Sequence, residues 1–335
     1  MGHATYLQAL AGPSGEPLMR GGAVPALAVV AALALGTFGL GAAAALISRH
    51  GLGDGFAVLL AVGALGIVLE TAHGVLLAGA ATELGLLVVL ALLLVVPLLV
   101  AHRRRGLAGD GPRVPVPTCG LAVVAIPGAA IGALATLGAW FEPLGPLAAV
   151  LGASAGAGTA VRCGLTVGLA LLLARLFSAP AAVLRSWERV SPERFDVAAA
   201  GDVRRALGAA NVRSVVLVAG VSLLPTATNA IGGLVLRADA FLALAVIAMV
   251  GLDLADEARA RAGGVRLASA WGLHRVHAAD PALAALAAAG IPAHARALRY
   301  RALFHFFAPY TPVEILVPVE RSAEAEAVCA RIAAP

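Results

Sequence analysis

Long runs of apolar residues, separated by short polar segments, dominate residues 1–260 of this chain. A helix needs about 20 apolar residues to cross the hydrocarbon core of a bilayer. The pattern therefore predicts seven transmembrane helices, near residues 23–47, 56–78, 84–101, 120–139, 158–177, 212–234 and 240–255. Residues 1–22 contain Pro13, Gly15 and Pro17 and are predicted to be an irregular lead-in.

The first polar interruption is the stretch LISRHGLGDGF at residues 46–56. Gly51, Gly53 and Gly55 can adopt positive φ, so the backbone can reverse within a few residues. Arg49 carries a charge that is expensive at mid-membrane depth. The glycines, together with Asp54, therefore predict a turn in water between the first two helices.

Arginine occurs in alternate loops of this predicted arrangement. The loops at 79–83 and 140–157 hold none, and the connection at 235–239 holds only Arg237, beside Asp239. The other loops hold Arg49, then Arg103, Arg104, Arg105 and Arg113, then Arg185, Arg189, Arg194, Arg204 and Arg205. Short cytoplasmic loops of membrane proteins are enriched in positive charge. The alternation predicts that the arginine-bearing loops and the C-terminus are cytoplasmic and that the N-terminus is outside.

Composition supports a membrane protein. Apolar residues make up 60% of the 335 residues and charged residues 13%, with a mean hydropathy of +0.92. These values exclude an ordinary soluble globular protein. The net charge of +5 comes from arginines in short loops and not from one patch, so no DNA partner is expected. Cys119, Cys163 and Cys329 lie far apart and predict neither a disulfide framework nor a zinc site.

The composition changes after Ala262. Apolar alternation at 265–273 and 312–318 predicts strands, and the runs at 281–289 and beyond 318 predict helices. A turn is expected at Gly290 to Pro292. The fold expected for the whole chain is thus an all-α polytopic membrane domain at 23–260, followed by a small cytoplasmic α+β domain at 263–335.

Several short motifs follow one another along the chain in an order that resembles that of the SecY family, the channel subunit of the general protein translocase. The motifs are Gly36 and Thr37, the turn Gly51 to Gly55, Arg103 to Arg105 before Gly120, Phe177 to Pro180, and Met249 to Asp253. The match covers roughly residues 30–260 and corresponds to the fourth through tenth spans of the family. The family's first three spans have no counterpart, and the large cytoplasmic loops are shorter.

This resemblance implies a multi-pass protein of the bacterial inner membrane that takes part in protein translocation as a passive polypeptide-conducting or scaffold subunit. The implied partners are a SecE-like subunit, SecA or the ribosome, and a chain that supplies the missing spans. By the same resemblance, Leu60 and Val246 are candidates for the pore constriction. Candidates for partner binding are Arg103, Arg104, Arg105, Arg204 and Arg205.

Two alternatives remain open at this point. One is a membrane-anchored regulatory protein in which the helical part only holds the cytoplasmic domain, and the missing gate-forming spans favour it. The other is a small-molecule permease, which would need paired ionisable residues at the bilayer midplane. Separately, residues 289–292 and 313–318 weakly resemble a small family of ferredoxin-like signalling domains.

No enzymatic chemistry, cofactor or metal is expected. An intramembrane serine protease of the rhomboid kind needs the motif Gly-x-Ser-Gly. Here Gly152 and Ser154 match the first and third positions, but Ala155 stands in place of the last glycine. His274 and His277 form a single H-x-x-H pair, which more often belongs to a surface or core than to a metal site. Asp253, Asp256 and Glu257 are interpreted as residues at the boundary of the last span.

Overall fold

The computed structural model describes residues 23–77, 105–106, 113–114, 130, 133–134, 137–138, 141–152, 157–177, 179–190, 200–216, 238–303 and 311–333. The chain divides into two compact units, Met1–Leu59 and Leu60–Pro335. The first contains α2 (Ala23–His50) and the start of α3 (Gly55–Leu77), whose remainder belongs to the second.

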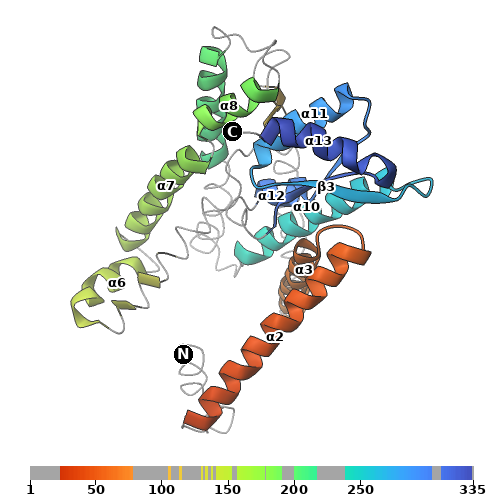
Figure 1. The fold of residues 1–335 in the computed structure, drawn as a ribbon. Coiled ribbons are helices and arrows are strands. Elements are labelled where there is room, and N and C mark those ends of the chain that lie inside the picture. The colour runs from red at the N-terminus through yellow and green to blue at the C-terminus, as the bar shows by residue number, and fades with distance from the viewer. Residues whose placement is uncertain are drawn as a thin grey trace. The chain divides into compact units, whose positions relative to one another are not determined.

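Helix α2, the long red helix in Figure 1, is apolar and exposed along most of its length. Leu35 is 72% exposed and Phe38 is 78% exposed. Within the described residues, Leu27–His50 is the one helical stretch long and apolar enough to cross a membrane. A secretory signal near an N-terminus has the same properties, so the stretch indicates either membrane association or a signal sequence.

The expectation of seven spans is wrong for the described part of the chain, which shows no such polytopic pattern. In α3 the apolar stretch found among the described residues is Gly55–Glu70, and in α7 (Ala157–Phe177) it is Cys163–Leu173; both are shorter than the helix at Leu27–His50. Helix α10 (Ala238–Ala260) buries one face in the protein and ends in acidic residues. The predicted span at 84–101, and most of those at 120–139 and 212–234, lie outside the described residues.

Short helices make up the middle of the chain. They are η1 (Glu142–Leu144), α6 (Gly145–Gly152), α7, α8 (Pro180–Val190) and a helical segment at 200–216. Two-residue strands β1 (Arg105–Gly106) and β2 (Arg113–Val114) pair antiparallel. In the segment at 200–216, Val203, Leu207 and Val215 pack on Leu184 and Val183 of α8 and on Ala170 of α7.

A three-stranded antiparallel sheet organises the C-terminal region. Its strands β3 (Leu267–Leu273), β4 (His294–Arg296) and β5 (Val313–Pro318) lie in the order β3-β5-β4. A bulge between Ser269 and Trp271 interrupts the pairing of β3 with β5. The helices around the sheet are α10, η3 (Val276–Ala278), α11 (Ala279–Ala288), α12 (Leu298–Leu303), η5 (Val319–Arg321) and α13 (Ser322–Ala333). Strands β3 and β5 and helix α11 lie where the apolar pattern predicted them.

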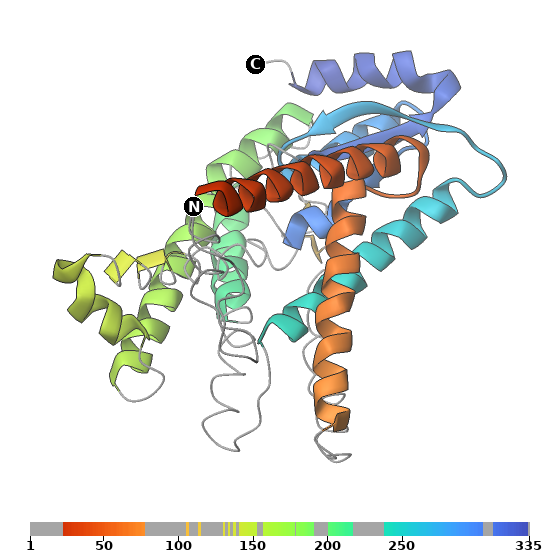
Figure 2. The same ribbon diagram turned by 90° about the horizontal axis from the view of Figure 1, so that it is seen from below.

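The sheet has a helical layer on each face, as Figure 2 shows with α13 on one side and α10 and α12 on the other. Successive strand residues point to opposite faces. In β5, Val313, Ile315 and Val317 accordingly pack with Leu286 of α11 and Val328 of α13 in one hydrophobic core. Between them, Glu314 and the buried Leu316 point to the α10 side.

The end of α11 shows how the local sequence fixes this core. Asp280 and Pro281 occupy the first turn, where a negative charge and a missing N–H are both tolerated. Gly290 adopts φ +70°, and the amide of Ile291 donates to the carbonyl of Leu286 at 2.9 Å. This glycine termination turns Ile291 into the core, where it is buried.

Candidate functional site

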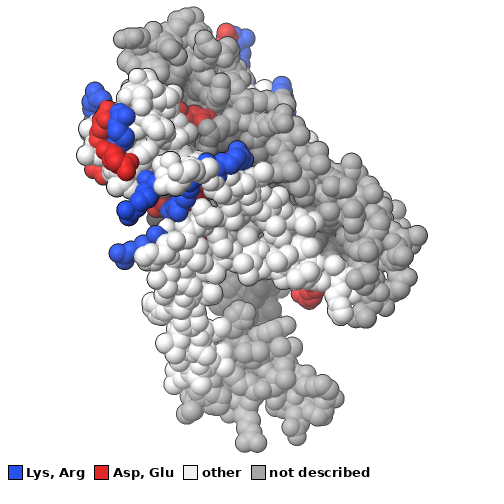
Figure 3. Space-filling model, turned by 90° about the vertical axis from the view of Figure 1, so that its right-hand side faces the viewer, with Lys and Arg blue, Asp and Glu red and all other residues white. Residues whose placement is uncertain are grey.

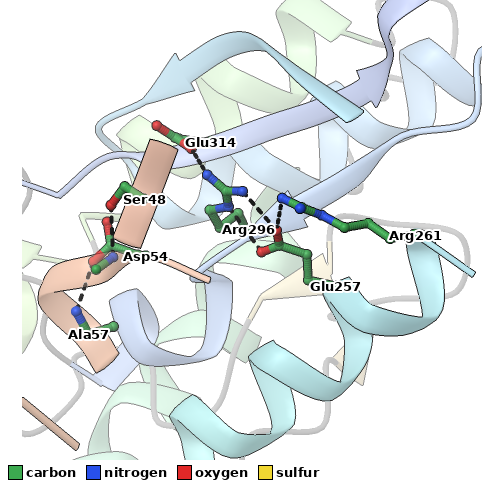
Figure 4. Close-up of polar contacts among 8 residues, drawn as sticks. Ser48, Asp54, Ala57, Glu257, Arg261, Arg296 and Glu314 are labelled. Atoms are coloured by element: carbon green, nitrogen blue, oxygen red, sulfur yellow. Dashed lines mark hydrogen bonds and ion pairs between the residues drawn. The ribbon is translucent and has the colours of Figure 1, made fainter. Parts of the chain in front are cut away.

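The most distinctive polar feature of the described chain is a cluster of buried ion pairs between α10 and the sheet (Figure 4). The guanidinium of Arg296 on β4 binds the carboxylate of Glu257 with two hydrogen bonds, Nη2 to Oε1 at 2.7 Å and Nε to Oε2 at 3.0 Å. Arg296 Nη1 also donates to Glu314 Oε2 at 2.9 Å, and Arg261 Nη2 donates to Glu257 Oε1 at 2.6 Å. Glu257 is fully buried, so this geometry replaces its lost hydration.

One helical turn earlier, Asp253 holds the start of α12. Its Oδ1 accepts the backbone N–H of Arg299 at 3.1 Å, and its Oδ2 accepts that of Tyr300 at 2.9 Å. The side chain of Arg299 adds ion pairs with Asp253 and with Asp256. The first turn of a helix leaves backbone N–H groups without partners, and here a carboxylate from another helix satisfies two of them.

Ala297 connects β4 to α12 in a left-handed backbone conformation, with φ 60°. Among the described residues it alone has positive φ without being a glycine. Such a conformation is unfavourable for a residue with a Cβ by about 1–2 kcal/mol. Ala297 is buried, and the interactions of Arg296 before it and Arg299 after it hold the connection in place.

Burial changes the proton affinities in this charge cluster, by which we mean Asp253, Asp256, Glu257, Arg261, Arg296, Arg299 and Glu314. Burial raises the pKa of Asp253 to about 6, against the hydrogen bonds from Tyr300 and Arg299 that lower it. Burial alone would lower the pKa of Arg296, but its bonds to Glu257 and Glu314 raise it overall. The Arg296 pairs are therefore stable as charges, whereas the pKa of Asp253 lies well above its ordinary value of 3.8, at about 6.

Two histidines near the sheet are held neutral. Burial, followed by the charge of Arg275, lowers the pKa of His277 to about 4. Burial also lowers the pKa of His294 on β4, although the nearby charges of Glu257 and Asp256 act in the opposite direction. The exposed His274 shares the H-x-x-H pair with His277. Within the described residues, no group of three or more His, Cys, Asp or Glu side chains is arranged to hold a metal ion.

The interpretation of Asp253, Asp256 and Glu257 as simple boundary residues is wrong, because they bind Arg296 and Arg299 from a distant part of the chain. The sequence did carry a signal. Spacings of three and four residues place the three acids on one face of a helix. Their two arginine partners are three residues apart, and a short strand and turn bring them to that face.

The predicted turn after α2 is present, and side chains close it (Figure 4). Asp54 Oδ1 accepts the amide of Ala57 at 2.9 Å and so caps α3, while Ser48 Oγ accepts the amide of Gly55 at 2.8 Å. Gly53 has φ +81°. A Cβ at Gly55 would lie 1.9 Å from the carbonyl oxygen of Ala44, so only glycine fits there, whereas Gly51 has negative φ.

The other predicted site residues fall in separate places. Arg103 and Arg104 lie outside the described residues, and Arg105 begins β1. Arg204 and Arg205 are exposed in the helical segment at 200–216, where Arg205 pairs with Asp202. On the face of the molecule in Figure 3, acidic and basic side chains of the described residues lie side by side at the upper left, and one acidic group lies apart from them.

The two pore-constriction candidates differ in burial. Leu60 is half-buried in α3, whereas Val246 is only 4% exposed. Val246 lies on the buried face of α10 together with Met249 and Val250. In this structure, therefore, the side chain of Val246 contacts protein and not an open path.

Comparisons of the chain with protein-family models, with curated proteins and with solved structures find no match. The resemblance to the SecY family therefore stays a prediction.

Proposed function

We propose that this chain is a membrane-anchored regulatory protein, in which apolar helices hold the C-terminal α+β region beside the bilayer. The helix at Leu27–His50 has the length and composition of an anchor. The sheet and its helices form a separate, water-compatible core of buried residues. In this proposal the N-terminal part anchors the chain, and the C-terminal part recognises a regulatory partner.

The observation that carries this proposal is the charge cluster. Glu257 and Asp253 lie on α10, while their partners lie on β4 and α12. A flexible linker would let the α+β region move freely, but buried, bidentate ion pairs require one fixed geometry. Helix α10 and the sheet therefore behave as one body, and a displacement of α10 is passed to the sheet.

The translocation role implied by the SecY resemblance makes a different demand. It places Leu60 of α3 in a constriction. The function would then depend on the amino-acid sequence of these helices as much as on the C-terminal region. A ring of apolar side chains that yields to a peptide must face an open path. The burial of Val246 supports the regulatory proposal over this role.

An exchange experiment separates the two functions. In the source organism, residues 23–77, which comprise α2 and α3, are replaced by an unrelated pair of apolar membrane helices joined by a polar turn. The readout is the quantitative proteome, compared with that of a strain in which the gene is deleted. We expect the exchanged chain to restore the normal proteome, because these helices act only as an anchor.

A second variant tests the α+β region in the same assay. Glu257→Gln breaks the cluster and is expected to reproduce the deletion, whereas Glu324→Gln, in the exposed Arg321–Glu324 pair, is expected to behave as wild type. The proposal is wrong if the exchanged chain fails while Glu257→Gln restores the normal proteome. That result would favour the translocation role.

A further inference from the structure

The helical segment at 200–216 has one face buried in the protein and one face free. Val203, Leu207 and Val215 are buried against α7 and α8, together with the side chains of Asn211 and Ser214. The opposite face contains residues that are exposed although they are small or apolar, namely Gly201, Gly208, Ala209, Val212 and Val216.

This free face has a regular order. With 3.6 residues per turn, Gly208, Val212 and Val216 follow one another along a stripe, with Ala209 beside them. Val212 is 54% exposed and Val216 is 67% exposed. Arg204 and Arg213, both exposed, lie on opposite edges of the stripe. Arg205 lies on the stripe one turn before Ala209 and is paired with Asp202.

An apolar stripe with an arginine on each edge is the pattern of a helix that lies in a membrane interface. The valines can enter the boundary between headgroups and acyl chains, while the long arginine side chains reach outward to the phosphates. Anionic headgroups attract such arginines by about 1 kcal/mol each near the surface. A nucleic acid would also attract the arginines, but it offers nothing to the exposed valines.

We infer that the free face of residues 200–216 binds the surface of a bilayer that contains anionic phospholipid. Its inner face is already covered by α7 and α8, so the segment lies flat as a preformed element and has no need to fold on binding. This contact is distinct from the anchorage by α2, and its failure would leave the proposed function intact.

A fluorescent label at Ala209 tests the inference. The full chain, carrying Ala209→Cys with Cys119→Ser, Cys163→Ser and Cys329→Ala, is labelled with an environment-sensitive dye and placed in nanodiscs. We expect a blue-shifted emission, quenched by lipids with a spin label near the headgroup, in phosphatidylcholine mixed with phosphatidylglycerol. In phosphatidylcholine alone, or at high salt, the shift is expected to shrink because the charge attraction is lost or screened.

The controls decide the interpretation. Arg204→Gln with Arg213→Gln should abolish the shift, whereas Arg331→Gln, at an exposed arginine of α13, should leave it unchanged. A label at the exposed Ala330 of α13 should stay in water. The inference is overturned if the Ala209 label stays in water with anionic lipid, if the Ala330 label responds equally, or if only added RNA moves the Ala209 emission.

Trypsin provides a second measurement on the unaltered chain, in case the cysteine replacements disturb folding. In nanodiscs with anionic lipid, cleavage after Arg204, Arg205 and Arg213 should slow severalfold relative to phosphatidylcholine alone. Cleavage after Arg331 should not change. The inference would be contradicted if, at each of these four arginines, the cleavage rate were the same in both lipid compositions.

Discussion

Helix α2 and the C-terminal sheet region are built for different surroundings. Along α2 no charged residue occurs between Ala23 and Ser48, and its leucines and Phe38 are exposed. Around the sheet, Leu286, Ile315 and Leu303 are fully buried, and even charged groups such as Glu257 lie inside with partners. The first region exposes its apolar side chains, while the second buries them in an interior of its own.

This difference shows that apolar composition has two structural outcomes in the same chain. Both helices are apolar around most of their circumference, but α2 is exposed along most of its length, whereas α10 buries one face in the protein and carries acids toward its C-terminal end. A helix that is apolar on all sides suits either lipid or a protein interior. The predictions below test whether the two regions respond to substitutions as this comparison requires.

The largest effect is expected in α2. Leu35→Arg combined with Phe38→Arg should remove the chain from the membrane fraction, because each arginine near mid-membrane is unfavourable by about 2.5–3.5 kcal/mol. Membrane flotation measures the loss. The matched control is Val319→Arg, at an exposed apolar position beside β5, which should float as wild type. If the α2 variant still floats fully, the helix does not anchor the chain.

The next largest effect is expected at the charge cluster. Glu257→Gln leaves Arg296 buried without its carboxylate partner, and breaking a buried pair in this way is unfavourable by about 3–5 kcal/mol. Amide hydrogen exchange in β4 and α12 should therefore be about a hundredfold faster or more, since each 1.4 kcal/mol is about tenfold.

Two comparisons make this prediction specific. Glu324→Gln removes an exposed ion pair and should leave exchange unchanged. Glu257→Leu combined with Arg296→Leu removes both charges and should recover much of the loss, since apolar replacements of a buried pair are often neutral. Equal exchange in Glu257→Gln and wild type would show that the cluster contributes little to stability.

A smaller effect is expected at the turn. Gly55→Ala places a methyl group against the carbonyl of Ala44 and should destabilise the packing of α2 on the start of α3 by about 1–3 kcal/mol. Gly63→Ala, at a helical position with no atom within 4 Å of the new Cβ, should stabilise α3 by about 0.5–1 kcal/mol. Thermal unfolding in detergent distinguishes the two. A melting temperature that rises in both variants would argue against the close contact.

The smallest effect is expected when wild type is acidified. The folded pKa of Asp253 is raised from 3.8 to about 6, so its contribution favours folding below about pH 4 and is lost as pH rises to 6. The folded pKa of His277 is lowered from 6.5 to about 4, so its contribution is lost as pH falls through that range. The two slopes oppose each other, and the melting temperature should change little.

Single variants should separate these opposed slopes. Asp253→Asn should make stability fall on acidification from pH 6.5 to 4, because His277, aided by His294, then acts alone. His277→Gln should make stability rise over the same interval. Melting temperatures of the full chain at several pH values test both signs. Parallel profiles in the two variants would contradict the assignment.

Local sequence was enough to predict part of the fold. The glycines and Asp54 predicted the turn after α2, and apolar alternation predicted β3 and β5. It failed at α10, whose apolar composition is also that of a membrane helix. Alanine, leucine and valine raise the hydropathy of α10, but its contacts with β4 and α12 are set by tertiary structure.

The charge cluster could not be predicted for a related reason. Strand β4 has only three residues, and α12 has only six, so neither has a clear period in the sequence. The pairing of Arg296 with Glu257 spans 39 residues. It depends on the left-handed conformation of Ala297, which no local preference of alanine would suggest. The acidic face of α10 was visible in the sequence, but its partner was not.

The bulge in β3 bears on the proposed anchorage. Chains anchored as proposed would share a two-dimensional space, where copies would meet far more often than they would in bulk water. Strand β3 lies at the border of its sheet, and a straight border strand invites a neighbouring chain to add its own strand. The irregular spacing beside Ala270 interrupts the regular strand geometry that such a neighbour would need, and this would disfavour strand addition between copies.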